Sequence, residues 1–265
     1  MSAAEDLLRA GNVGACLTQL QNDIRRAPQD AKLRVFLAQL LMITGEWERA
    51  TQQLAVVGEL DASALPMKHT YTAAIQCEQL RARVLAGTAA PLILGEPPQW
   101  IAALRQSLVL QSQGRGAEAL AMRAHALEEA PATAGKLNGE PFEWIADADS
   151  RLGPVLELVL NGSYYWVPFE RIRRIQCEKP SDARDLVWLP ATFTWTNDGE
   201  AVGLIPVRYP GSESAEDDAI RLARKTAWTE LEPGTFTGLG QRILATSADE
   251  IALLEVREIA LDGSG

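Results

Sequence analysis

Residues 147–169 read DADSRLGPVLELVLNGSYYWVPF, and this stretch predicts a β-hairpin. Residues 155–160 are apolar apart from Glu157, Asn161-Gly162 supplies a two-residue turn, and residues 163–167 return as an aromatic strand. An Asn-Gly pair favours the positive φ angles that tight hairpin turns need. A β-sheet is therefore expected in the second half of the chain.

The residues around this hairpin extend the predicted sheet. Five of the seven tryptophans lie after residue 140, where Val, Thr and Tyr also gather. Further strands are predicted at 186–196 and 201–208, joined by a turn at 197–199, and at 242–247 and 253–259. Short helices are predicted at 169–175 and 216–228. The expected product is a compact α+β domain with a substantial β-sheet.

The N-terminal part contains a repeat. Gly11 and Gly45 are 34 residues apart, which is the period of a tetratricopeptide repeat. In the second unit Trp47, Ala50 and Leu54 are spaced to pack one helix against another. A third, displaced match begins at Gly114, and helices are expected at 67–87 and from residue 99. Pro97-Pro98 lies between these two helices and interrupts them, because this pair cannot sit inside a helix.

These patterns predict a multidomain α and α+β protein. Residues 1–135 are expected to form a tetratricopeptide-like α-α superhelix, and residues 136–265 a compact C-terminal α+β domain. Stacked helical repeats present an extended groove that commonly takes a peptide or a helix. The residues of the repeat are needed for its own packing, so they do not by themselves identify a ligand.

Composition favours a soluble cytoplasmic protein. The chain has 265 residues, of which 47% are hydrophobic and 23% charged. Its N-terminus lacks a basic segment followed by an apolar run, which argues against a secretory signal. Its apolar stretches are far shorter than the roughly 20 residues of a membrane helix. We therefore expect no membrane partner.

The charge distribution argues against nucleic acid as a partner. The net charge is −10, and residues 141–265 carry 12 Lys and Arg against 21 Asp and Glu. An acidic half repels phosphate backbones, whereas it attracts a basic partner. Cysteines at 16, 77 and 177 are too few and too scattered for a disulfide framework or a zinc site. We expect Cys16 to be a small buried apolar group.

We expect no enzyme active site, cofactor or metal. His69 and His125 lack further ligands at zinc spacing, and no nucleophile elbow or phosphate-binding loop occurs. Asp147 and Asp149 are the best candidates for a metal-dependent enzyme, because carboxylates bind Mg²⁺. The alternative favoured here is that they cap the turn and pair with Arg151 or Arg184.

Arginines beside aromatic strand segments have two interpretations. They can hold the domain together as buried pairs, or they can form an exposed hot spot for a partner. The candidates for partner binding are Trp166, Arg184, Trp188, Arg208 and Tyr209. A separate group, Arg171, Arg173 and Arg174, is expected on a solvated helix face.

Six blocks follow one another along the second half of the chain: RLGPVLE (151–157), GSYYWVPF (162–169), RDLVWLPA (184–191), PVRYPGSE (206–213), LARKTAW (222–228) and GQRIL (240–244). In this order they resemble the characteristic blocks of the ImpE family, also called TagJ or SciE-like. Six blocks in register are far more specific than one motif.

The resemblance implies a cytoplasmic, non-enzymatic accessory protein of the bacterial type VI secretion system. It implies two partners, which are the N-terminal helix of the small subunit of the contractile sheath and the AAA+ unfoldase that disassembles the contracted sheath. It offers no catalytic residues, and it leaves open which surface takes the helix. A general helical-repeat scaffold or chaperone for another client is the alternative.

Overall fold

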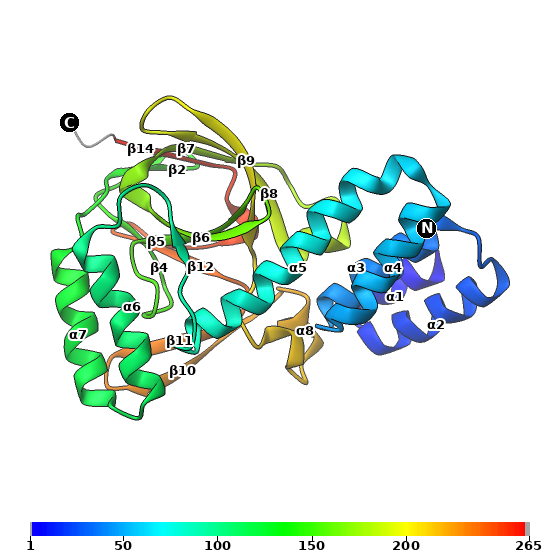
Figure 1. Ribbon diagram of the computed structural model, residues 1–265, viewed down its shortest axis with the longest axis horizontal. Helices are drawn as coiled ribbons and strands as arrows, with labels where there is room; N and C mark the ends of the chain where they lie inside the picture. The colour runs from blue at the N-terminus through cyan, green and yellow to red at the C-terminus, as the bar shows by residue number, and fades with distance from the viewer. Residues whose placement is uncertain (1, 263–265) are drawn as a thin grey trace.

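A computed structural model describes residues 2–262 of the chain, with a helical part and a large mixed sheet (Figure 1). The protein therefore has an α+β fold. The described residues contain eight α-helices: α1 (Ala3–Arg9), α2 (Val13–Arg26), α3 (Ala31–Ile43), α4 (Trp47–Leu60), α5 (Leu65–Leu85), α6 (Gln99–Ser112), α7 (Gly116–Glu129) and α8 (Asp218–Arg221).

Fourteen strands are described in three sheets. They are β1 (Leu92–Ile93), β2 (Gly135–Leu137), β3 (Glu140–Phe142), β4 (Ile145–Asp147), β5 (Val155–Leu160), β6 (Ser163–Pro168), β7 (Ile172–Cys177), β8 (Trp188–Trp195), β9 (Glu200–Pro206), β10 (Thr226–Glu232), β11 (Thr235–Gly240), β12 (Ile243–Thr246), β13 (Glu250–Ala252) and β14 (Glu258–Leu261). The main sheet has the order β1-β6-β5-β9-β8-β7-β14-β2-β3. The small sheets are β13-β12-β4 and β10-β11.

The two predicted hairpins are confirmed. Strands β5 and β6 pair around Asn161 and Gly162, which have φ angles of 50° and 74°. Both positive angles match the turn that an Asn-Gly pair favours. Strands β8 and β9 pair around the turn at residues 197–199. Strand β12 confirms the prediction at 242–247, while 253–259 holds a 3₁₀ turn (Leu253–Glu255) and only the start of β14.

Two predicted helices are wrong. Residues 169–175 form a 3₁₀ turn (Phe169–Arg171) and then strand β7. The pairing of β7 with β8 is irregular between Ile172 and Arg174, so Ile172 and Ile175 are both buried although they are three residues apart. This bulge imitates the spacing of a helix in the sequence. Within 216–228 the helix lasts one turn, as α8, and β10 begins at Thr226.

The turn glycines of the repeat occupy equivalent places. Gly11 lies between α1 and α2 with φ of 84°, and Gly45 lies between α3 and α4 with φ of 70°. The hairpin α6–α7 is not stacked beside these helices, because α5 carries the chain to the opposite end of the molecule (Figure 1). Strand β1 then pairs with β6 before α6 begins.

Strand β5 lies between two hydrophobic cores and is buried along its whole length. Val155 and Val159 face a core shared with α1 to α7, whereas Leu156 and Leu158 face the core of the C-terminal part. Helical and sheet residues therefore pack in one continuous cluster. The predicted division at residue 135 stays a prediction about folding units, since both parts contribute to that cluster.

Candidate functional site

A buried network of charged side chains occupies the junction between α5 and the sheet. The Nη1 of Arg242 lies 2.7 Å from Oδ2 of Asp147, and its Nη2 donates to Glu157. Arg81 on α5 donates to Glu157 through Nε and Nη2, at 3.0 and 2.9 Å. Side-chain exposure is 0% or 1% in each of these ion pairs. The network is therefore sealed from solvent.

Aromatic side chains complete the hydrogen bonding of these carboxylates. Tyr164 donates its hydroxyl proton to Glu157, and Trp166 donates from Nε1 to the Tyr164 oxygen at 2.8 Å. Tyr209 donates to Oδ1 of Asp147 at 2.9 Å. Because buried charges are costly unless they are paired and hydrogen-bonded, these contacts are what permits the burial.

The carboxylates of Glu157 and Asp147 differ in their pKa. For Glu157, burial raises the pKa, but the guanidinium groups of Arg81 and Arg242 outweigh it and lower the pKa to about 2. For Asp147, burial is the largest effect and raises the pKa to about 6, although Arg242 opposes it. Asp147 has one arginine partner and lies beside Asp149, whereas Glu157 has two arginines.

The carboxylates of Asp147 and Asp149 are engaged by the protein itself. Asp149 accepts from Arg151 at 2.9 and 2.6 Å and from the backbone N–H of Gly238 at 2.9 Å. The predicted pairing of Asp149 with Arg151 is confirmed. Pairing with Arg184 is wrong, because Arg184 pairs with Asp182 at 2.6 Å. Within residues 2–262, no group of three or more His, Cys, Asp or Glu is arranged to hold a metal ion.

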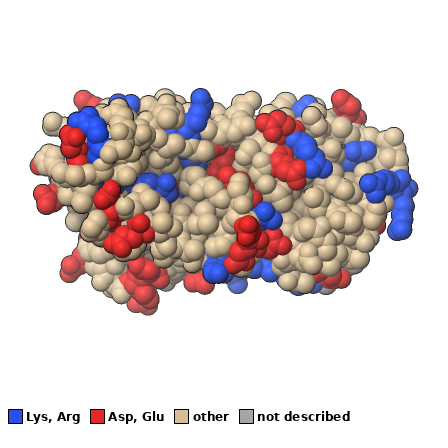
Figure 2. Space-filling view, turned by 90° about the horizontal axis from the view of Figure 1, so that it is seen from below, with Lys and Arg blue, Asp and Glu red and all other residues tan. Residues whose placement is uncertain are grey.

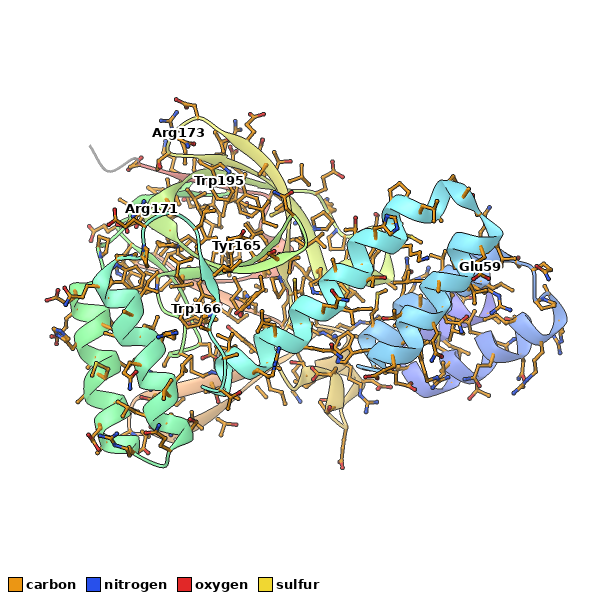
Figure 3. The ribbon with its side chains drawn as sticks, in the orientation of Figure 1. Glu59, Tyr165, Trp166, Arg171, Arg173 and Trp195 are labelled. Carbon is orange, nitrogen blue, oxygen red and sulfur yellow. The ribbon has the colours of Figure 1, made fainter. Side chains whose placement is uncertain are left out.

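The predicted partner-binding residues are mostly internal. Trp166 and Trp188 have 0% exposure, and Arg208 and Tyr209 have 4% and 1%. Figure 3 shows Trp166 inside the molecule below the sheet, and Arg173 at its outer margin on a strand. Arg184 keeps 24% of its side chain exposed. Burial favours the scaffold interpretation for Trp166, Trp188, Arg208 and Tyr209, whereas Arg184 is partly exposed.

The described thiols are not poised for catalysis. Cys16, Cys77 and Cys177 are free and buried. Burial raises the pKa of Cys16 and Cys77 to about 11 and that of Cys177 to about 12. Since the thiolate is the reactive form, these residues are poor nucleophiles. The prediction that Cys16 is a small buried group is confirmed.

A surface groove at the helical end is a candidate site for a partner. It has a volume of about 520 Å³ and lies between α1, α3, the end of α4 and a loop of the C-terminal part. Its lining is half apolar and half polar or charged: Glu5, Leu8, Arg9, Ala31, Lys32, Val35, Phe36, Gln39, Val57, Asp61, Ala64, Ser181, Asp182 and Ala183. The sequence did not reveal that residues 181–183 close one side, because they are far away along the chain.

Charged side chains of both signs are mixed on one face of the molecule. Figure 2 shows Lys and Arg there in separate small groups with Asp and Glu between them. That face lacks the single-sign field that draws in nucleic acid. No helix in the described residues is both long enough and apolar enough to cross a membrane.

Comparisons with known proteins locate the chain among relatives. The family described as ImpE protein matches residues 139–260. A Pseudomonas aeruginosa protein, named type VI secretion system accessory component TagJ, is 52% identical over 256 residues, which is 97% of this chain and 90% of that protein. A crystal structure of a Vibrio parahaemolyticus protein has a TM-score of 0.89, at 24% identity, over 99% of this chain and 98% of its own. At that identity the likeness concerns the fold alone.

Proposed function

The chain belongs to the ImpE family, as its sequence blocks predict, and from this we propose that it is a non-enzymatic accessory protein of the type VI secretion system. The observation that carries the proposal is the 52% identity to the accessory component TagJ across 97% of the chain. The described interior supports it, since each acidic group of the buried network is bound to arginine or tyrosine. The protein acts in the cytoplasm as an adaptor.

The adaptor binds the N-terminal helix of the small sheath subunit and assists or tunes disassembly of the sheath by the AAA+ unfoldase. The groove at the helical end supports this assignment. Val35 and Phe36 line it from α3, Leu8 lines it from α1, and all three are half-buried. A groove that offers both apolar and charged side chains suits an amphipathic helix, whose apolar side chains recur at every third or fourth position.

A tetratricopeptide-like arrangement of α1 to α4 also belongs to the proposal. Helices α1 and α2 and helices α3 and α4 form successive hairpins whose turn glycines are one repeat apart. Ala50 has 0% exposure at the contact of α4 with α3, where a small residue permits close approach. Helix pairs of this kind present grooves between neighbouring helices.

The test is a titration of a labelled peptide from the N-terminal helix of the small sheath subunit into the full chain. Binding should saturate in the micromolar range or tighter, and a scrambled peptide should not bind. No binding of the native peptide would remove the sheath contact from the proposal while leaving family membership intact.

A pair of matched variants tests the groove. Val35→Glu places a charge in the groove and should weaken peptide binding at least tenfold, because the apolar face of the peptide helix would have to cover that carboxylate. Val202→Glu makes the same change at a valine that is 70% exposed and should leave binding unchanged. Equal binding by both variants would move the helix site away from the groove.

A further inference from the structure

Strands β10 and β11 form a hairpin that is a two-stranded sheet of its own, and in Figure 1 its turn overlaps the lower ends of α6 and α7. In its register Thr226 lies opposite Gly240, Trp228 opposite Gly238, and Glu230 opposite Phe236. The N–H of Gln241 donates to the Lys225 carbonyl at 3.0 Å, one position before the first of these pairs. Hydrogen-bonded and non-hydrogen-bonded pairs alternate along an antiparallel ladder. The three pairs above are therefore non-hydrogen-bonded, and their backbone N–H and C=O groups point to the outer edges of the hairpin.

The outer edge of β11 is covered by the rest of the protein. Phe236 N–H donates to Oγ of Ser150 at 3.0 Å, and Gly238 N–H donates to Oδ2 of Asp149 at 2.9 Å. Gly240 N–H donates to Oγ of Ser212 at 2.7 Å. On the outer edge of β11, the backbone N–H groups of these three residues therefore all donate to side-chain oxygens of the same molecule.

The outer edge of β10 has no such cover. Its outward residues are Thr226, Trp228 and Glu230, and within residues 2–262 their backbone N–H and C=O groups make no hydrogen bond on that side. Figure 1 shows β10 along the margin of the molecule, with β11 between it and the body. A free edge of this kind is a template for pairing with another chain.

The side chains along this edge are exposed, aromatic and acidic. Trp228 is 39% exposed and packs at a tilt on Tyr209, with ring centroids 5.6 Å apart. Glu230 is exposed and lies on the same face as Trp228, two positions further. Phe236 on β11 is 41% exposed and lies beside Glu230. Register irregularity between Glu230 and Glu232 ends the regular edge there.

We propose that the outer edge of β10 binds an extended segment of a partner protein as an added strand. The segment carries an apolar residue opposite Trp228 and, two positions away on the same face, a lysine or arginine opposite Glu230. About five residues pair with positions 226–230, a length of about 17 Å at 3.4 Å for each residue. This surface is separate from the groove, so the inference goes beyond the proposed adaptor function.

Charge selects a basic segment over a second copy of this chain. Residues 141–265 carry 12 basic and 21 acidic side chains, and Glu230 and Glu232 lie on β10 itself. Pairing two copies through β10 would bring two acidic halves together. A basic strand instead gains cross-strand ion pairs and main-chain hydrogen bonds at once.

The test uses the full chain and the labelled peptide Thr-Val-Thr-Lys-Thr-Val-Thr, whose Val, Lys and Val share one face. Fluorescence anisotropy should show saturable binding below millimolar peptide. Methylation of the Val and Lys backbone nitrogens should abolish binding, because those N–H groups bond to β10. At saturation, amide hydrogen exchange should slow at residues 226, 228 and 230.

Matched variants test the acidic contact. Glu230→Gln keeps an oxygen for its hydrogen bond from the Gly234 N–H, which is 2.9 Å long, but removes the charge. It should weaken peptide binding roughly twofold to fivefold. Glu140→Gln removes an exposed charge from β3, one of the two edge strands of the main sheet, and should leave peptide binding unchanged.

Four results would overturn the proposal. They are no saturable binding, equal binding of the methylated peptide, unchanged exchange at the three amides, and equal affinity for the two glutamine variants. A dimer in sedimentation that protects the same three amides without peptide would also overturn it, because the occupant would then be a second copy of the chain.

Discussion

Arg81 on α5 and Glu157 on β5 form a two-pronged buried ion pair, with Nε–Oε1 and Nη2–Oε2 distances of 3.0 and 2.9 Å. Seventy-six positions separate them along the chain. The pair joins the helical part to an interior strand of the main sheet, and Glu78, one turn earlier on α5, holds Arg81 at 2.6 Å. Because this ion pair links α5 to β5, the helices and the sheet resist separation.

Arg81→Met should lower the free energy of unfolding by about 3–5 kcal/mol. The change removes an ion-pair partner from the buried Glu157 carboxylate, which water cannot reach to replace it. Urea unfolding followed by circular dichroism measures the change. The control is Arg115→Met, at a pair with Glu118 whose side chains are 50% and 60% exposed. That change should cost less than about 1 kcal/mol. Equal losses would contradict the importance assigned to burial.

The raised pKa of Asp147 predicts a pH-dependent stability. Its folded pKa of about 6 lies above the ordinary value of 3.8, so the folded state binds the proton more tightly. The resulting stabilisation is complete below pH 3.8 and is lost as the pH rises to about 6. Between pH 4 and 7 the protein should lose roughly 2 kcal/mol relative to Asp147→Asn, since at pH 4 the unfolded carboxyl is already partly ionised. Urea unfolding at several pH values gives this difference, and a constant difference would contradict it.

Ala50→Trp should destabilise the contact between α3 and α4. Ala50 has 0% exposure in a packed core, so an indole there forces the helices apart at a cost of about 1–3 kcal/mol or more. Thermal unfolding measures it as a fall in the melting temperature. An unchanged melting temperature would mean that the helix register around Ala50 is not as described.

The cysteines should be inert while the protein is folded. All three are buried with raised pKa values, so a thiol reagent at pH 8 should label none within minutes. In urea all three should react. Rapid labelling of one thiol in the native protein would show local opening around it, and digestion would identify the site.

Local sequence determined the parts of the fold that depend on local chemistry. Asn161-Gly162 and residues 197–199 supply their own turn conformations, so both hairpins followed from the sequence. The turn glycines at 11 and 45 likewise located two helix hairpins. Strand β7 did not follow, since its bulge between Ile172 and Arg174 is a property of pairing with β8.

Family membership also followed from the sequence alone, because six blocks in order are a linear pattern. The roles of the charged residues did not. Arg242 meets Asp147 and Glu157 from 95 and 85 positions away. Sequence spacing gave no sign of these pairings, and it offered Trp166, Trp188, Arg208 and Tyr209 as surface candidates.

Tertiary structure decided which surfaces are free. Residues 181–183 complete the groove of the helical end, and β11 shields one side of its hairpin while leaving β10 open. Turns and repeats are set by the dihedral preferences of neighbouring residues, which the sequence carries directly. Burial, ion pairing and free strand edges depend on which distant segments meet, and they exist only after the chain has folded.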